Sequence, residues 1–178
     1  MWNQMILFIL KKLLYNKIRY THWIAFTQYN SFLKIRNLVF NFYEKKRKKV
    51  VLKSKPYLIN SEPTNHCMLQ CPFCPTGKGE FRPKGFLDLD VYQKMVDQVS
   101  RYSYLITFHG WGEPLLHPHF SDMILYAHQK KICTVLTTNG MLLNKDNCQK
   151  IINSKLDVLY ISLDGASSET YQKYRVHG

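Results

Sequence analysis

Short apolar runs alternate along most of the chain with segments in which apolar residues recur every three or four positions. The apolar runs are typical of buried strands, and the periodic segments are typical of amphipathic helices. Strands are predicted over 56–60, 104–108, 132–137 and 156–163. Helices follow them, and Asp88, Asn144 and Ser167 stand where three of these helices begin and can cap them. The order β-α-β-α-β-α-β-α predicts an α/β fold of parallel βα units with right-handed crossovers.

The spacing of the apolar residues also predicts which faces of these helices are buried. The expected buried residues of three successive helices are Val91, Met95 and Val99; Phe120, Met123, Ile124 and Ala127; and Cys148, Ile151 and Ile152.

The first 56 residues follow a different pattern from the rest. Apolar residues at helical spacing predict one helical stripe of Trp2, Met5, Ile6, Ile9 and Leu13, and a second of Phe32, Ile35, Val39 and Phe42. No glycine or proline precedes Pro56. We therefore predict a helical arm over residues 1–56, followed by a core domain over residues 57–178.

Charge separates the same two parts. The chain has 25 Lys+Arg and 12 Asp+Glu, but residues 1–56 hold 13 of the basic residues and a single acid, Glu44. Three interpretations of this basic arm stay open: its apolar stripes dock on the body or on a partner, it lies on an anionic membrane surface through residues 1–49, or it binds nucleic acid. Nucleic acid is the weakest, because no recognition motif accompanies the charge.

The start of the chain carries neither a spanning helix nor a secretory signal in its pattern. The longest apolar run there, Met5–Leu10, is far shorter than the roughly 20 residues that a spanning helix needs. Lys11 and Lys12 follow this run, whereas a secretory signal places its charge before the run. We expect a cytoplasmic protein, peripheral at the membrane if the arm binds lipid, with its thiols reduced.

Ligand sites in parallel βα folds gather on the loops that follow the strands. The first of these loops holds Cys67, Cys71 and Cys74 at C-x3-C-x2-C spacing. Three thiolates could bind zinc with His66 or His109 as a fourth ligand, or an iron–sulfur cubane with one iron left open. Incidental thiols on a loop are the third interpretation. Cys133 and Cys148 lie in a predicted strand and helix, where we expect them to be small buried side chains.

The other three loops carry glycine and short polar residues. Gly112-Glu113 lies in the second, where glycine allows close backbone approach to a ligand and Glu113 either holds a ligand amine or braces the loop. Asn139-Gly140 in the third is also a turn dipeptide on any fold. In the fourth, Ser162 and Asp164 can hydrogen-bond a ligand, or Asp164 can cap the turn.

Taken together, the four loops resemble those of the radical S-adenosylmethionine (SAM) enzymes. Phe73 precedes the last cysteine as an aromatic does in that family, and the second loop resembles the Gly-Gly-Glu element with Trp111 in place of the first glycine. The third and fourth loops resemble the Thr-Asn-Gly and Ser-x-Asp-Gly elements. The resemblance runs from Lys55 to Gly178 and is closest to the branch that often carries a C-terminal, SPASM-like domain for extra clusters.

The resemblance implies a partial parallel (β/α) barrel and two cofactors, a [4Fe-4S] cluster and SAM. Cys67, Cys71 and Cys74 would ligate three irons, and SAM would chelate the fourth. Phe73 would pack on the adenine. The remaining implied contacts of SAM are Gly112 and Glu113 at the methionyl amine, Ser162 at the ribose or methionyl edge, and Asn139 and Asp164 nearby.

The reaction that the resemblance implies is an oxidoreductase-like radical reaction. A flavodoxin- or ferredoxin-like donor would supply one electron, SAM would be cleaved, and a 5′-deoxyadenosyl radical would abstract hydrogen from a substrate that the sequence does not identify. Relatives continue the pattern beyond the four strands predicted here, so we expect a truncated reading frame or one piece of a split protein, with an apolar sheet edge exposed. The alternative is a non-catalytic fragment that binds a cluster or zinc and is tethered to a membrane or partner by its basic arm.

Overall fold

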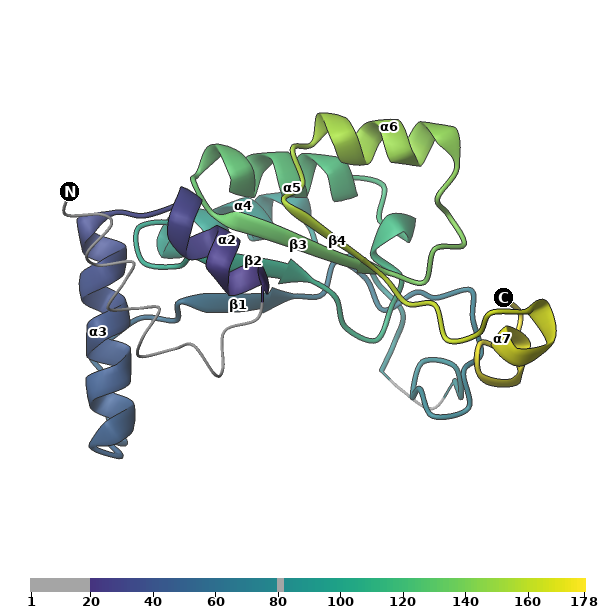
Figure 1. Ribbon diagram of the computed structural model, residues 1–178, viewed down its shortest axis with the longest axis horizontal. Coiled ribbons are helices and arrows are strands. Elements are labelled where there is room, and N and C mark those ends of the chain that lie inside the picture. Colours follow the sequence, from purple (N-terminus) through teal and green to yellow (C-terminus); the bar gives the residue numbers. More distant parts are fainter. Residues whose placement is uncertain (1–19, 80–81) are drawn as a thin grey trace.

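The fold is built on a parallel sheet of four strands in the order β1-β2-β3-β4 (Figure 1). The computed structural model describes residues 20–79 and 82–178. The strands are β1 (Leu58–Ser61), β2 (Leu105–Phe108), β3 (Cys133–Thr138) and β4 (Val158–Ile161). Each strand pairs only with its neighbours in chain order, so every connection is a crossover through helical structure. The predicted α/β partial-barrel fold class is confirmed.

The helices follow the predicted alternation. They are α2 (Tyr20–Gln28), α3 (Phe32–Lys46), α4 (Leu89–Val99), the 3-10 turn η1 (Pro114–Leu116), α5 (Phe120–Gln129), α6 (Lys145–Asn153) and α7 (Ser168–Tyr174). The side chains of Asp88, Asn144 and Ser167 each accept a backbone N–H at the first turn, as predicted. Ser167 forms a capping box with Thr170.

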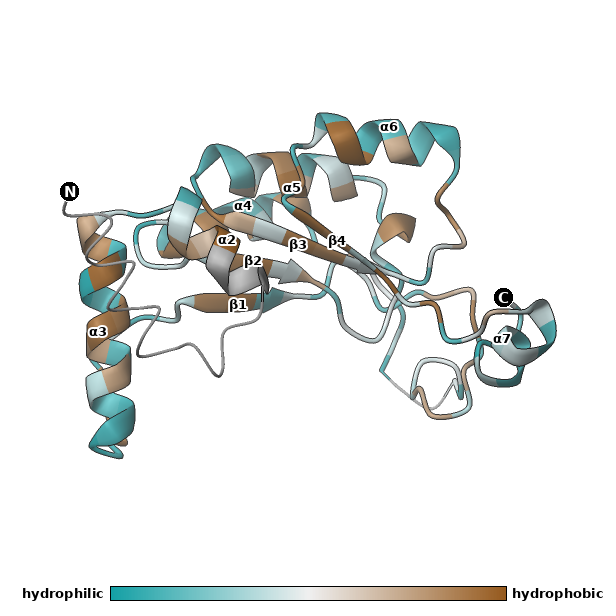
Figure 2. Cartoon of the chain, viewed as in Figure 1, coloured by the Kyte–Doolittle hydropathy of each residue, from teal (hydrophilic) through white to brown (hydrophobic). Residues whose placement is uncertain are grey.

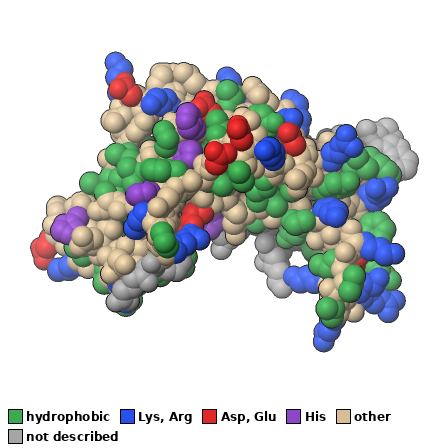
Figure 3. Space-filling view, turned by 180° about the vertical axis from the view of Figure 1, so that it is seen from behind, with side chains coloured by type: hydrophobic (Ala, Val, Ile, Leu, Met, Phe, Trp, Pro, Cys, Tyr) green, Lys and Arg blue, Asp and Glu red, His purple; other side chains and the backbone are tan. Residues whose placement is uncertain are grey.

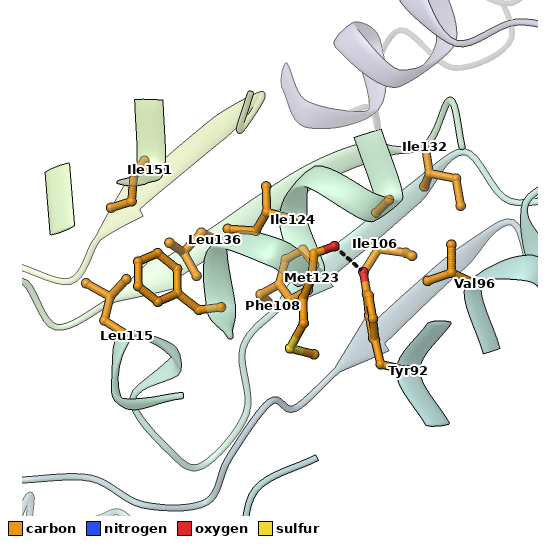
Figure 4. Packing of buried hydrophobic residues seen from close by; sticks show 12 residues of the cluster. Tyr92, Val96, Ile106, Phe108, Leu115, Met123, Ile124, Ile132, Leu136 and Ile151 are labelled. Atoms are coloured by element: carbon orange, nitrogen blue, oxygen red, sulfur yellow. Dashed lines mark hydrogen bonds between the residues drawn. The ribbon is translucent and has the colours of Figure 1, made fainter. Parts of the chain in front are cut away.

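The main core lies between the sheet and α4, α5 and α6 (Figure 4). Figure 2 shows hydrophobic residues along the ribbon of β3, which is almost wholly buried, as central parallel strands are. Ile106 and Leu136 of the sheet are fully buried against Met123 and Ile124 of α5. The hydroxyl of Tyr92 donates to the carbonyl of Met123 at 3.0 Å, so the phenol keeps a partner inside this core.

Two helix faces differ from the prediction. The fully buried residues of α4 are Tyr92 and Val96, whereas Val91 is exposed, because the large tyrosine ring turns the buried face one residue along the helix. In α6, Ile151 is buried in the main core, Cys148 is only half-buried and Ile152 is exposed, because α6 packs mainly beside α5 and turns one narrow face inward. The predicted burial of Val91 and Ile152 is therefore wrong.

The arm docks on the opposite face of the sheet through α2. Ala25 and Phe26 of α2 form a second core cluster with Leu105 of β2 and with Cys133 and Val135 of β3. α2 therefore docks on the body, although neither of the two predicted apolar stripes of the arm lies on this helix. The division of the chain at residue 56 remains a prediction, and the stripe from Trp2 to Leu13 lies outside the described residues.

The predicted stripe on α3 is wrong. Phe32, Val39 and Phe42 are exposed, and the helix instead buries Lys34, Asn37, Leu38 and Glu44. The reason is that the amide and carboxylate groups of this face bind the backbone of residues 53–55 and therefore turn inward. Within the described residues, no helix combines the length and the apolar character needed to cross a membrane.

Among the described residues, no strand pairs with the outer edge of β4, as expected. Tyr160 and Ile161 are exposed on this strand, and Leu163 follows them with 73% of its surface exposed. An unpaired strand edge with apolar side chains is a surface to which further strands can add.

A network of polar side chains links the end of α2 to β3 and to the start of β4. The carboxylate of Asp157, just before β4, accepts the Tyr29 hydroxyl at 2.6 Å and the backbone N–H and hydroxyl of Thr134 at 2.7 and 2.9 Å. His128 lies 3.2 Å from the same tyrosine oxygen. Burial, with Asp157 adding to it, raises the pKa of Tyr29, so the phenol stays a donor.

We expect Tyr29→Phe to lower the free energy of unfolding by about 1 kcal/mol, because Asp157 loses a donor in a partly buried site. Chemical denaturation measures this. Tyr160→Phe, on an exposed side chain of β4, is the matched control and should leave the stability unchanged. Equal stability of both variants would show that the arm does not depend on this network.

Candidate functional site

A pocket of about 250 Å³ lies at the C-terminal ends of the strands. All four of the loops singled out in the sequence line it. The predicted site residues that line it are Cys67, Cys71, Phe73, Cys74, Gly112, Glu113, Asn139 and Ser162. Asp164 lies outside this lining. The folding of parallel strands thus gathers side chains that are far apart in the sequence.

The cysteine loop is compact, and none of its three cysteines forms a disulfide. Cys67, Cys71 and Cys74 are all free, with Cys71 buried and the other two half-buried. The N–H of Cys74 donates to the carbonyl of Cys71 at 3.0 Å, which makes a tight turn between them. Burial is the largest cause that raises the pKa of Cys67, and the neighbouring Glu113 adds to it.

The donor set fits a cluster better than a single ion. Within residues 20–79 and 82–178, no three His, Cys, Asp or Glu side chains converge as they would on one metal ion. A cubane places each thiolate on a different iron, so its three ligands surround a volume instead of a point. His66 stacks on Phe86 at 4.7 Å between ring centroids and His109 bonds Asn60, so neither proposed fourth zinc ligand joins the thiols.

Glu113 braces the second and third loops. Its side chain is buried, and one carboxylate oxygen accepts the N–H of Leu115 at 3.1 Å and the hydroxyl of Thr138 at 2.8 Å. The other oxygen accepts the N–H of Asn139 at 2.8 Å. Burial raises the pKa of Glu113, while these donors act in the opposite direction. Of the two roles considered for Glu113, bracing is the one these hydrogen bonds fill.

Gly112 is required by close packing of the second loop on the first. A Cβ atom at this position would lie 2.0 Å from the carbonyl oxygen of Thr64 and 2.8 Å from Cα of Asn65. The N–H of Glu113 donates to the carbonyl of His66 at 2.7 Å across the same contact. The second loop can therefore lie against the cysteine loop only with glycine at this point.

Asn139 connects the third loop to the cysteine loop. Its amide nitrogen lies 3.8 Å from Sγ of Cys67 and 3.2 Å from Sδ of Met68. Its oxygen accepts the N–H of Met141 at 2.9 Å, and Gly140 has a φ of +86°, so the residue pair also makes a turn. The turn interpretation of this dipeptide is confirmed, and the ligand role of Asn139 stays a prediction.

Of the two residues predicted on the fourth loop, Ser162 and Asp164, only Ser162 lines the pocket. Ser162 lines the pocket and its N–H donates to the carbonyl of Thr138 at 2.9 Å. Asp164 accepts the guanidinium of Arg175 at 2.6 Å, and Arg175 itself lines the pocket.

Arg175 is a pocket residue that the sequence analysis did not single out. One of its terminal nitrogens lies 3.8 Å from Sγ of Cys71. Although its burial acts to lower it, the pKa of Arg175 is raised by the hydrogen bond to Asp164 and by proximity to Cys71. The spacing of residues around Arg175 contains no signal that α7 folds back over the cysteine loop.

Phe73 stands at the mouth of the pocket. It is 79% exposed, and its ring stacks on that of Tyr174 with 6.2 Å between centroids. An exposed aromatic ring at a pocket mouth offers a flat face on which a planar ligand group can stack.

We expect Gly112→Ala to lower the melting temperature, because its methyl group would overlap the backbone of Thr64 and force the two loops apart. Thermal unfolding measures the change. Gly85→Ala is the control, since a Cβ there meets nothing within 4 Å. Equal melting temperatures for both variants would contradict this packing.

We expect Glu113→Gln to destabilise the fold by about 1 to 3 kcal/mol. The carboxylate accepts hydrogen bonds on both oxygens, and the amide of glutamine would place its own N–H group against one of these donors. Urea unfolding measures the loss. Glu169→Gln removes an exposed carboxylate that pairs with Lys173 on α7, and its effect should stay below about 0.5 kcal/mol. A loss as small as the control's would rule out the bracing role.

Comparisons with curated proteins find relatives that are longer than this chain. The AdoMet-dependent heme synthase of Methanosarcina barkeri is 30% identical over 126 residues, which cover 71% of this chain and 36% of the relative. A tungsten-containing aldehyde ferredoxin oxidoreductase cofactor-modifying protein of Pyrococcus furiosus is 31% identical over 105 residues, or 58% of this chain and 29% of that protein. The chain thus spans about a third of the length of these relatives.

Solved structures share the fold. SuiB of Streptococcus suis bound to S-adenosylmethionine matches with a TM-score of 0.60 at 19% identity, over 96% of this chain and 37% of its own. BtrN in complex with AdoMet and 2-DOIA matches with a TM-score of 0.58 at 21% identity, over 66% of this chain and 49% of its own. The family model of the radical SAM superfamily matches residues 61–178, the part that holds the sheet and the pocket. On its sequence and its fold, this chain belongs to the radical SAM superfamily.

Proposed function

We propose that this chain forms the cofactor-binding part of a radical SAM enzyme, with Cys67, Cys71 and Cys74 holding a [4Fe-4S] cluster. Members of this superfamily use such a cluster together with SAM. The observation that carries the proposal is that three free thiols of one loop line a single pocket with the polar groups of three other loops. When bound and reduced by one electron, the cluster and SAM supply a 5′-deoxyadenosyl radical, which abstracts hydrogen from the substrate.

The proposed contacts of SAM follow from the lining of the pocket. Phe73 offers a ring face to the adenine, and Gly112 brings backbone carbonyls close to the methionyl amine. Glu113 acts at the same place by holding the second loop against the third. Ser162 offers its hydroxyl to the ribose or methionyl edge, and Asn139 its amide beside Cys67.

Asp164 is proposed as a more distant member of this set. Its support is indirect, because it pairs with Arg175 and Arg175 lines the pocket. The pair keeps a positive charge beside the sulfur of Cys71.

The partners are proposed by their chemical class alone. A flavodoxin- or ferredoxin-like protein supplies the electron, and the substrate is not identified, since the relatives' names describe different reactions. We propose a cytoplasmic location, with a membrane or protein contact through residues 1–49.

Anaerobic reconstitution with iron and sulfide, followed by dithionite and SAM, tests the function. A brown protein that releases 5′-deoxyadenosine supports the proposal. Stoichiometric zinc without SAM cleavage would overturn it and leave a zinc-bearing fragment instead.

Cys71→Ala should lose nearly all of the iron bound and all of the visible absorbance, because one of three ligands is missing. Cys148→Ala is the control, since Cys148 is a free, half-buried cysteine on α6 and lies outside the pocket. Iron analysis and absorption spectra compare the two. Iron retained by Cys71→Ala at the level of the control would contradict the proposed ligand set.

A further inference from the structure

A surface on α3 and on the loop that follows it, residues 47–55, takes no part in the pocket. We propose that this surface, the basic ridge, docks on a membrane containing anionic lipid. The inference rests on the contact proposed for residues 1–49, assigns it to α3 and residues 47–55 with one partner, and is independent of the cluster chemistry.

Apolar side chains on the basic ridge are unusually exposed. Val50 and Val51, at the tip of the loop, are 96% and 84% exposed. The other exposed apolar residues of the ridge are Phe32, Leu33, Val39, Phe40, Phe42, Tyr43 and Leu52. Soluble monomers rarely gather so many large apolar side chains on one exposed segment unless something binds there.

Positive charge surrounds these apolar residues without exposed acids among them. The exposed cations are Arg36, Lys45, Lys46, Arg47, Lys48, Lys49, Lys53 and Lys55. Glu44 is the one acid of residues 1–56, and its side chain is buried. Figure 3 shows the result at the lower right, where basic and hydrophobic side chains alternate on a part that projects from the body.

The buried polar residues of α3 hold the loop of the ridge in place. The carboxylate of Glu44 accepts the N–H of Lys53 at 2.9 Å and the hydroxyl of Ser54 at 2.6 Å. Asn37 and Asn41 bind the backbone of Lys55 with three hydrogen bonds between 2.8 and 2.9 Å. The apolar tip at Val50–Leu52 is therefore presented by a fastened loop, which reduces the ordering cost of docking.

Anionic lipid is the partner that can bind both the cations and the apolar side chains of this surface. Anionic headgroups attract the cations, and the interface with the acyl chains accepts the apolar tip. A nucleic acid would use the cations and stack on aromatic rings, but the aliphatic Val50, Val51 and Leu52 would gain nothing from it. A protein partner is less suited, because lysine is depleted in protein–protein interfaces.

Docking through the ridge leaves the cofactor pocket accessible. The loop ends directly before β1, so the ridge lies at the N-terminal ends of the strands, whereas the pocket lies at their C-terminal ends (Figure 1). A membrane against α3 would therefore face away from the cysteine loop.

Co-sedimentation of the full chain with lipid vesicles tests the proposal. We expect binding to phosphatidylcholine vesicles containing about 30% phosphatidylserine, a loss of binding as salt is raised, and little binding to pure phosphatidylcholine. SAM cleavage measured on the same preparation keeps a failure of this proposal distinct from a failure of the proposed enzyme activity.

Two ridge variants and one control locate the contact. The triple variant Lys45→Gln, Lys46→Gln and Lys48→Gln should weaken vesicle binding by about fivefold per lysine, or roughly 100-fold. The triple variant Val50→Ser, Val51→Ser and Leu52→Ser should weaken it by roughly tenfold or more while keeping every charge. The control removes the same charge from α4 and α6 as Lys94→Gln, Lys145→Gln and Lys150→Gln, and should bind within about twofold of the unchanged protein.

Three results would overturn the proposal. One is equal binding to neutral and anionic vesicles. Another is a loss in the control as large as in the lysine variant of the ridge. The third is salt-sensitive binding to single-stranded RNA without vesicle binding, which would make nucleic acid the partner. All of the substituted side chains are exposed, so unchanged thermal unfolding checks that each variant folds.

Discussion

The buried carboxylate of Glu113 is the interaction on which the geometry of the pocket depends. It accepts donors from its own loop and from the third loop, and its backbone N–H donates to the first. A carboxylate is suited to this position because it accepts several hydrogen bonds at once and has none of its own to satisfy. The cost is the burial of a charged group, which appears as the raised pKa. The loops themselves contain little regular structure. The hydrogen bonds of this one side chain therefore hold them together, as the backbone hydrogen bonds between paired strands do within a sheet.

A single strand face shows how the fold separates its structural and functional parts. Along β3, Cys133 and Val135 lie under α2 in an apolar cluster, and Thr137, two residues further on the same face, lines the pocket. The arm helix thus closes the apolar end of the sheet and leaves the polar end free. This is why α2 belongs structurally with the sheet although its sequence pattern and charge set it apart.

Periodicity predicted the sheet well because parallel strands buried on both faces leave a plain signal, as 104–108 and 132–137 do. The caps Asp88, Asn144 and Ser167 were also readable, since capping depends on local hydrogen bonds. The buried faces of α3 and α4 could not be predicted in this way, because they depend on partners distant in sequence. These partners are residues 53–55 for α3 and helix α5 for Tyr92 of α4. The cysteines and glycines of the site could be recognised from their loops, while Arg175 could not, because only the tertiary fold brings α7 to Cys71.

The contact between the cysteine loop and the segment after α7 has a consequence for how the site is made. Gln70 donates its N–H to the carbonyl of Val176 at 3.0 Å, and its side chain bonds His177, which lies 107 residues later. At ribosomal rates of roughly 5 to 20 residues per second, the cysteine loop is therefore synthesised about 5 to 20 seconds before the segment that covers it. During that interval the cysteines are open to iron, to sulfide and to oxidants alike.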